Sequence, residues 1–165
     1  QLLGKRLMRE SIGKVFHSDL GRAARTAELL GLDTPLGDDD RLREMACGSA
    51  DGKKLEEVRQ HDEEKYQIWR SEEPDFTFVG GESFRQVQDR MFDGRLHHAK
   101  SHPDETIVVV SHGLALRLFL KRIMSIPLGK PTPWYLRNTS LSHIEYRTDD
   151  SWRMYSFGDV AHLEP

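Results

Sequence analysis

The stretch TIVVVSHGLALRLFL, residues 106–120, decides the fold of this chain. Residues 107–110 form an unbroken run of apolar β-branched side chains, which is typical of a strand buried on both faces in the middle of a parallel sheet. A short SHG segment follows at residues 111–113, and beyond it apolar residues recur at helical spacing. The sequence therefore predicts a strand–turn–helix unit with His112 in the turn between the strand and the helix.

This position is chemically favoured, because open α/β sheets bind ligands at the carboxyl ends of their strands. The N–H groups and the dipole of a following helix attract an anion to the same place. Gly113 removes a side chain where a ligand needs close access to the backbone. The alternative is a core histidine bonded to a carbonyl group beside a turn glycine. We favour ligand binding at His112 and Gly113.

Composition limits the function classes. The 165 residues suffice for one domain, 1–165, and the 37% hydrophobic and 31% charged contents are those of an ordinary polar protein. A net charge of −3 argues against general affinity for nucleic acid. Cys47 is the single cysteine, which excludes an intrachain disulfide and favours a reducing compartment. No apolar run approaches the ~20 residues of a membrane span. We expect a soluble, cytoplasmic protein with no nucleic-acid or membrane partner.

A second strand–helix unit precedes the first one in the chain. Residues 14–18 read as a short strand, Asp19 as a helix N-cap, and residues 20–30 as a helix that Gly31 ends. Arg22 lies in the first turn of that helix, and its planar fork of donors suits phosphate or carboxylate. A solvated surface arginine is the alternative.

The remaining segments are less informative one by one. Glu44 stands in a stretch without a clear period, where a loop carboxyl group is a candidate general acid and a surface glutamate is the alternative.

His98 and His102 are four residues apart on a helix, but no acidic or cysteine partner accompanies them, so we expect an exposed polar helix end and no metal site. The other expected elements are a loop at 33–40, one charged helix at 54–70, a helix at 84–101 capped by Ser83, and an antiparallel hairpin of strands 139–147 and 152–157.

Four motifs in order resemble the histidine phosphatase superfamily, also called the phosphoglycerate mutase-like family. They are HSDLGRAARTA at 17–27, RLREM at 41–45 followed by Gly48, GGES at 80–83, and VSHG at 110–113. Each motif is weak alone, but four at matching spacing resemble the family along essentially the whole chain.

The resemblance implies a fold and a mechanism. The fold is an α/β, three-layer α/β/α sandwich with a mostly parallel central sheet and an antiparallel C-terminal hairpin strand. Such enzymes move phosphate through a phosphohistidine. By resemblance, Arg22 clamps the phosphate, His112 with Gly113 also contacts it, and Glu44 protonates the leaving oxygen. No metal or cofactor is implied, and the partner is a small phosphorylated metabolite.

The sequence departs from the family pattern at one motif. The nucleophilic histidine of the family belongs to an Arg-His-Gly motif after the first strand, and residues 1–165 contain no such motif. Either the sequence omits a natural N-terminal segment with that strand, or the product lacks phosphotransfer activity. We favour the first explanation, because loss of a central strand exposes apolar surface.

The short segment between Gly52 and Gly80 and the ending at 158–163 resemble the small broad-specificity phosphatases. A phosphomonoester hydrolase is therefore our first hypothesis. The alternatives are a phosphoglycerate mutase and a non-catalytic domain that binds a phosphorylated ligand. A homodimer is compatible with all three hypotheses.

Overall fold

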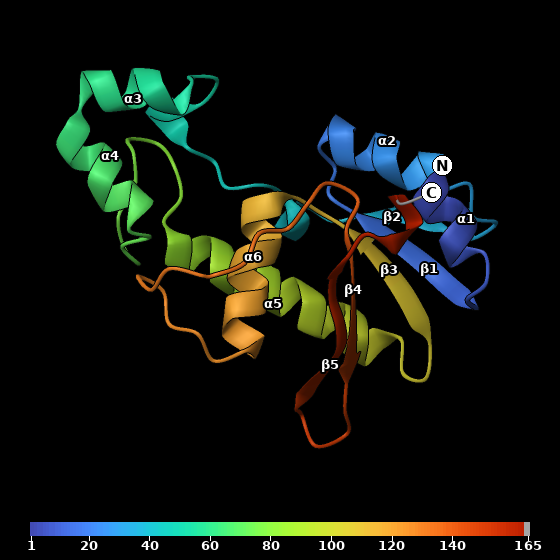
Figure 1. The fold of residues 1–165 in the computed structure, drawn as a ribbon. Helices are drawn as coiled ribbons and strands as arrows, with labels where there is room; N and C mark the ends of the chain where they lie inside the picture. Colours follow the sequence, from blue (N-terminus) through green and yellow to red (C-terminus); the bar gives the residue numbers. More distant parts are fainter. Residues whose placement is uncertain (164–165) are drawn as a thin grey trace.

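The computed structural model describes residues 1–163 and contains two β-sheets (Figure 1). The first is parallel, with strand order β2-β1-β3, and the second is the antiparallel β4–β5 hairpin near the C-terminus. The strands are β1 (Ile12–His17), β2 (Leu36–Asp38), β3 (Thr106–Val110), β4 (Leu141–Tyr146) and β5 (Trp152–Asp159). The parallel sheet and the C-terminal hairpin confirm the coarse α/β prediction.

Helices cover both faces of the parallel sheet. The α-helices are α1 (Leu2–Leu7), α2 (Gly21–Leu29), α3 (Leu55–His61), α4 (Glu63–Arg70), α5 (Phe84–Ser101) and α6 (Gly113–Ile123), and short 3-10 turns lie at Asp40–Leu42, Gly48–Ala50 and Ala161–Leu163. Successive side chains of a strand point to opposite faces. Accordingly, Val15 packs with Leu7 and Ala27 on the side of α1 and α2, whereas Phe16 belongs to the core on the side of α5 and α6. No helix within residues 1–163 is long and apolar enough to cross a membrane.

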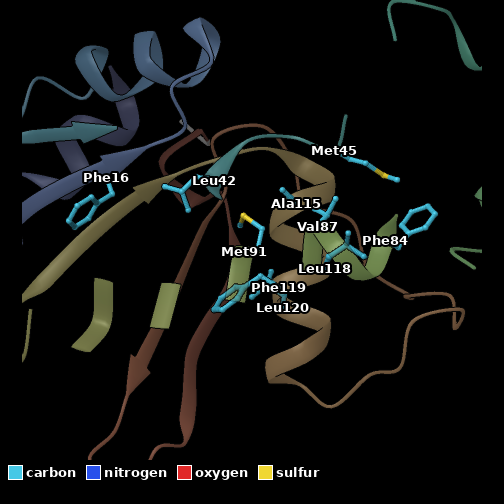
Figure 2. Close-up of a cluster of buried hydrophobic side chains, with 10 residues drawn as sticks. All are labelled: Phe16, Leu42, Met45, Phe84, Val87, Met91, Ala115, Leu118, Phe119 and Leu120. Atoms are coloured by element: carbon cyan, nitrogen blue, oxygen red, sulfur yellow. The ribbon is translucent and has the colours of Figure 1, made fainter. Parts of the chain in front are cut away.

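The larger core lies between α5 and α6 (Figure 2). Val87 and Met91 of α5 and Leu118 of α6 are fully buried. Burying each such side chain stabilises the fold by about 1.5–3 kcal/mol. This packing fixes the start of α6, and with it the position of the residues that follow β3.

The position of β3 differs from the prediction. Its side chains at residues 107–110 are only half-buried, and β1, not β3, is the central strand. Within residues 1–163, β3 pairs with β1 along one edge, and no backbone hydrogen bond joins it to β4 or β5. The prediction of a strand buried in mid-sheet is therefore wrong for this structure, because the second edge of β3 has no neighbouring strand among residues 1–163.

Several local predictions are confirmed. Ser83 caps α5 by accepting from the backbone N–H of Gln86, and the Gln86 side chain accepts in turn from the N–H of Ser83 at 2.8 Å. Gly31 follows α2 with a φ of +64°, a conformation that favours glycine. The turn between β4 and β5 falls at the predicted Asp149 and Asp150.

Three local predictions are wrong. Asp19 does not cap α2, since its carboxylate pairs with Arg43 instead. The segment 33–40 contains β2, because three residues suffice to extend the sheet beside β1. The expected single helix at 54–70 is two helices, and Asp62 breaks it by capping α4 through the N–H of Lys65 at 3.0 Å.

Candidate active site

Arg22, Glu44 and His112 come together at one end of the parallel sheet. Arg22 follows β1 in the first turn of α2, and His112 follows β3 as the N-cap residue of α6. These two parallel strands are neighbours, so their carboxyl ends meet at one edge. The Nε of Arg22 donates to Nδ1 of His112 at 3.0 Å. The structure therefore places the three predicted residues in one site.

His112 is only 7% exposed. Because its Nδ1 accepts a hydrogen bond from Arg22, the neutral imidazole carries its proton on Nε2. That nitrogen is buried and has no hydrogen-bond partner among residues 1–163. Burial, together with the Arg22 charge, lowers the pKa of His112 below its ordinary value. The ring is thus a neutral donor, and an oxygen ligand would satisfy it.

Arg22 has donor capacity left after this bond. Its Nε is used by His112, and in the part of the chain that is described the two terminal nitrogens of its guanidinium have no partner. The residue is exposed, so these nitrogens can reach a ligand. A guanidinium with two uncommitted amino groups is suited to two oxygens of one phosphate.

Glu44 occupies the start of α6. Its Oε2 accepts from the backbone N–H of Leu114 at 3.2 Å, and its Oε1 accepts from those of Ala115 and Met45, each at 3.0 Å. The helix N-terminus that the sequence analysis assigned to an anionic ligand therefore holds this carboxylate. A side chain added at Gly113 would meet nothing within 4 Å, so no protein contact requires glycine there. Ligand binding at Gly113 remains a prediction.

Sequence analysis missed the residue that holds the Glu44 loop. Arg90 of α5 donates to the carbonyl oxygens of Arg41 and Arg43, both at 2.8 Å, and to that of Glu44 at 3.2 Å. Its other contacts are with Glu82, at 2.7 and 2.9 Å. An arginine on a charged helix carries no motif, so only the presence of Glu82 in the GGES segment hinted at this support.

The glycines of the GGES and LRE segments allow two loops to touch. Gly48 has a φ of +52°, and a Cβ there would lie 2.3 Å from the carbonyl oxygen of Val79. At Gly81, a Cβ would lie 2.8 Å from the carbonyl oxygen of Ala46. Real Cβ atoms essentially never show such contacts, so Gly48 and Gly81 are needed for the close packing of these two loops.

A cavity of about 540 Å³ lies beside the site. Arg22 and Glu44 line it, together with residues from α3, α4 and the segment before α5. In Figure 1 these two helices stand to one side of the sheet. Cys47 also lines the cavity, and burial raises the pKa of its thiol, which keeps it protonated. The volume falls in the range of small-molecule sites.

The histidines of α5 do not form a metal site in this structure. His98 is buried, stacks on Phe16 with ring centroids 3.7 Å apart, and contacts the Asp39 carboxylate at 2.7 Å. The expectation of an exposed helix end is therefore wrong for His98, although His97 is exposed. Within residues 1–163, no group of three or more His, Cys, Asp or Glu side chains is arranged to hold a metal ion.

The fold and the site define an α/β protein whose arginine, histidine and glutamate meet at the carboxyl edge of a parallel sheet. The family model described as the histidine phosphatase superfamily (branch 1) matches residues 1–160. The chain belongs to this superfamily, as its four motifs predict.

Relatives at about 30% identity include two probable phosphoglycerate mutases and one solved structure. The probable phosphoglycerate mutase GpmB of Salmonella choleraesuis is 30% identical over 174 residues, covering 98% of this chain and 78% of that protein. GpmB of Cronobacter sakazakii is 32% identical, covering 93% and 74%. Among solved structures, YhfR of Bacillus stearothermophilus has a TM-score of 0.93 at 31% identity, covering 99% of this chain and 82% of that one.

A more distant structure supports the fold alone. The mycobacterial glucosyl-3-phosphoglycerate phosphatase Rv2419c, solved in complex with VO3, has a TM-score of 0.82 at 22% identity. The aligned part covers 96% of this chain and 82% of that one. This likeness shows that the two chains share a fold.

Proposed function

We propose that this protein is a phosphomonoester hydrolase that works through a phosphohistidine intermediate. The observation that carries the proposal is the Arg22–His112 pair, in which Arg22 donates to Nδ1 of His112 and Nε2 of His112 is left without a partner among residues 1–163. Donors aimed at one oxyanion position stabilise a transferring phosphoryl group without reorganisation during the reaction. Family membership makes phosphate the expected ligand.

The proposed reaction has two steps. A histidine nitrogen attacks phosphorus while the bond from phosphorus to the substrate oxygen breaks, and Glu44 gives that oxygen its proton. Arg22 and His112 hold the non-bridging phosphoryl oxygens. Water then attacks the phosphohistidine, Glu44 takes the proton of the water, and inorganic phosphate leaves. Proton transfer of this kind typically raises the reaction rate about 10²–10⁴-fold.

The nucleophilic histidine belongs, in this proposal, to a segment outside residues 1–165. We place its strand between β3 and the β4–β5 hairpin, which would join the two sheets into one central sheet of a three-layer sandwich. The support is the unpaired edge of β3 and the half-buried apolar side chains on β3 and β4. A strand in this position would bring its carboxyl end beside His112.

Hydrogen exchange on the native protein tests this placement. On a strand paired along one edge, alternate backbone N–H groups lack a partner and exchange quickly. If a further strand pairs with β3, all of its amides from Thr106 to Val110 exchange slowly. Alternating fast and slow exchange along β3 would show that no further strand pairs with it.

A phosphoglycerate mutase is the second candidate, because relatives at 30–32% identity carry that name. A mutase returns the phosphoryl group to the substrate, whereas a phosphatase gives it to water. The two activities are separated by measuring, on the same phosphoglycerate, the rate of isomerisation primed by a bisphosphoglycerate and the rate of phosphate release to water. Faster isomerisation than release identifies a mutase.

The decisive experiment measures turnover and phosphate binding in the same variants. His112→Ala should lower kcat/KM for phenyl phosphate by about 10³-fold or more, while His97→Ala, an exposed neighbour of the buried helix face, should keep the parental value. Acid-labile phosphorylation of a histidine during turnover supports the intermediate. Phosphate affinity without any turnover would instead identify a non-catalytic binding domain.

A further inference from the structure

The loop that carries Glu44 is held by side chains from another part of the fold. Residues 43–47 belong to no helix or strand, so their backbone carbonyl groups need other hydrogen-bond partners. The Nη1 of Arg90 donates to the carbonyl oxygens of Arg41 and Arg43, and its Nη2 donates to that of Glu44. One guanidinium therefore fixes the backbone at Glu44 and just before it.

Glu82 holds the same loop just after Glu44. Its carboxylate accepts from the Nε of Arg90 at 2.7 Å and from the Nη2 at 2.9 Å, and its Oε2 also accepts from the backbone N–H of Ala46 at 3.0 Å. The backbone N–H of Glu82 donates to the carbonyl oxygen of Ala46 at 2.8 Å. Burial raises the pKa of this carboxyl group, but the bonds from Arg90 and Ala46 outweigh it, so the pKa lies below its ordinary value. Glu82 is therefore ionised at neutral pH and stays bonded to Arg90.

The Arg90–Glu82 pair is fixed to the protein core. Val87, one turn before Arg90 on α5, and Met91, next to it, are both fully buried. The side chains of the pair are 20% and 26% exposed, so water competes little for their bonds. Two parallel bonds between a guanidinium and a carboxylate fix the orientation of both groups. The position of the Glu44 loop is therefore set by the packing of α5.

We infer that the Arg90–Glu82 pair is a positioning unit for the proton donor: it keeps the carboxyl group of Glu44 at the start of α6. The inference rests on the proposed hydrolase function and assigns it two positioning residues. Among residues 1–163, neither side chain of the pair is hydrogen-bonded to Arg22 or His112. The pair therefore acts on proton transfer to the leaving oxygen and not on the binding of the phosphoryl group.

Two substrates separate this role from a general effect on folding. The leaving oxygen of ethyl phosphate needs a proton, whereas that of nitrophenyl phosphate needs little protonation. Arg90→Gln should lower kcat/KM for ethyl phosphate about tenfold more than for nitrophenyl phosphate, or further, because a catalytic group misplaced by about 1 Å can cost about 10²-fold in rate. Loss of folded protein or of phosphate affinity lowers both rates alike. Equal losses on the two substrates would overturn the inference.

Arg85 provides a matched control on the same helix. Its Nε and Nη2 donate to the carboxylate of Asp75 at 2.7 and 3.0 Å, nearly the geometry of the Arg90–Glu82 pair. Within residues 1–163, its side chain has no hydrogen bond to the loop at 41–46. Arg85→Gln should therefore keep the parental ratio of the two substrates. An equal change of the ratio in Arg85→Gln and Arg90→Gln would overturn the inference.

A milder variant carries the same test if Arg90→Gln fails to fold. Glu82→Gln keeps the shape of the side chain, but its one carbonyl oxygen cannot accept from both Arg90 and the N–H of Ala46 as the carboxylate does. The substrate ratio should shift in the same direction as in Arg90→Gln. A parental ratio in Glu82→Gln would contradict the role of the pair.

A double variant shows whether the pair acts through Glu44. Once Glu44→Gln has removed the proton donor, adding Arg90→Gln should change the substrate ratio by less than about twofold, because the two changes act on one step. A further change as large as that of Arg90→Gln alone would mean that Arg90 acts independently of Glu44, which would overturn the inference.

The position of Glu44 can also be measured without turnover. Its carboxylate accepts from the backbone N–H groups of Leu114 and Ala115. Arg90→Gln should speed hydrogen exchange of these two amides relative to the later amides of α6, whereas Arg85→Gln should not. If no phosphomonoester is hydrolysed but this difference holds, the hydrolase proposal fails and the positioning of Glu44 stands. Parental exchange at both amides in Arg90→Gln would overturn the inference.

Discussion

Arg22 donates from Nε to Nδ1 of His112, and this single bond determines which imidazole nitrogen carries the proton of the neutral ring. A guanidinium nitrogen can only donate, so the neutral ring must keep its own proton on Nε2. The two residues thus act as one unit, in which the arginine both contributes charge and sets the tautomer of the histidine.

Replacing Arg22 with lysine should therefore lower the activity, although lysine keeps the positive charge. An ammonium group lacks the planar fork and cannot hold both His112 and a phosphoryl oxygen in the same geometry. We expect Arg22→Lys to lower kcat/KM for phenyl phosphate about 10²-fold, in line with the loss of about 1.5–3 kcal/mol for a hydrogen bond to a charged group. Arg25→Lys is the control, since Arg25 lies one turn further on α2 and pairs with Glu28 at 2.7 Å. Equal losses in both variants would contradict a specific role for Arg22.

The pKa of His112 should respond to Arg22 in a definite direction. Burial and the Arg22 charge both lower it, so the ring stays neutral to a lower pH than a free histidine does. Removing the cation with Arg22→Gln should raise this pKa, and binding inorganic phosphate should raise it as well, because the dianion favours the imidazolium. NMR titration of the imidazole resonances measures both shifts. A pKa that falls or stays constant in Arg22→Gln would show that the arginine does not control the ring.

Glu44→Gln should have a structural effect and a catalytic effect. The carboxylate accepts three backbone N–H bonds, and a glutamine can accept only through its carbonyl oxygen. We expect a loss of about 1–2 kcal/mol in the free energy of unfolding, as for a lost helix cap. Turnover should fall far more for alkyl phosphates than for nitrophenyl phosphate, whose leaving group needs little protonation.

Comparing the two substrates separates the effects, since instability alone lowers both rates equally. Equal losses would remove Glu44 from the role of proton donor and leave it as a cap of α6. Urea unfolding of the same variant measures the structural part.

The sequence predicted the strand–turn–helix units well, because their signals are local. The apolar run at 107–110, the SHG turn and the helix behind it need only neighbouring residues to be read. What it missed depends on contacts across the fold. Arg90 binds the carbonyl oxygen of Glu44, which lies 46 residues earlier in the sequence. The burial of β3 depends on whether another strand lies beside it. Asp19 looked like a cap because its partner Arg43 is 24 residues away.

The buried His98 gives the protein a measurable sensitivity to acid. Burial lowers the pKa of His98 to about 4, although Asp39 lies 2.7 Å from its Nε2, and two nearby arginines act in the same direction as burial. Because this value lies below the ordinary 6.5, the unfolded chain binds the proton first as the pH falls. The free energy of unfolding should therefore decrease between pH 6.5 and 4, by about 3 kcal/mol at about 1.4 kcal/mol per pH unit.

Two neighbouring histidines make the measurement specific. His98→Gln removes the buried titrating group, and urea unfolding at several pH values should show a flatter decrease from pH 6.5 to 4 than in the parent. His97→Gln changes the exposed neighbour and should keep the parental slope. The lowered pKa of Asp39 acts in a separate window, because its contribution is lost only as the pH falls below the ordinary carboxyl range. If His98→Gln keeps the full slope above pH 4, the buried imidazole is not the group that makes the fold sensitive to acid.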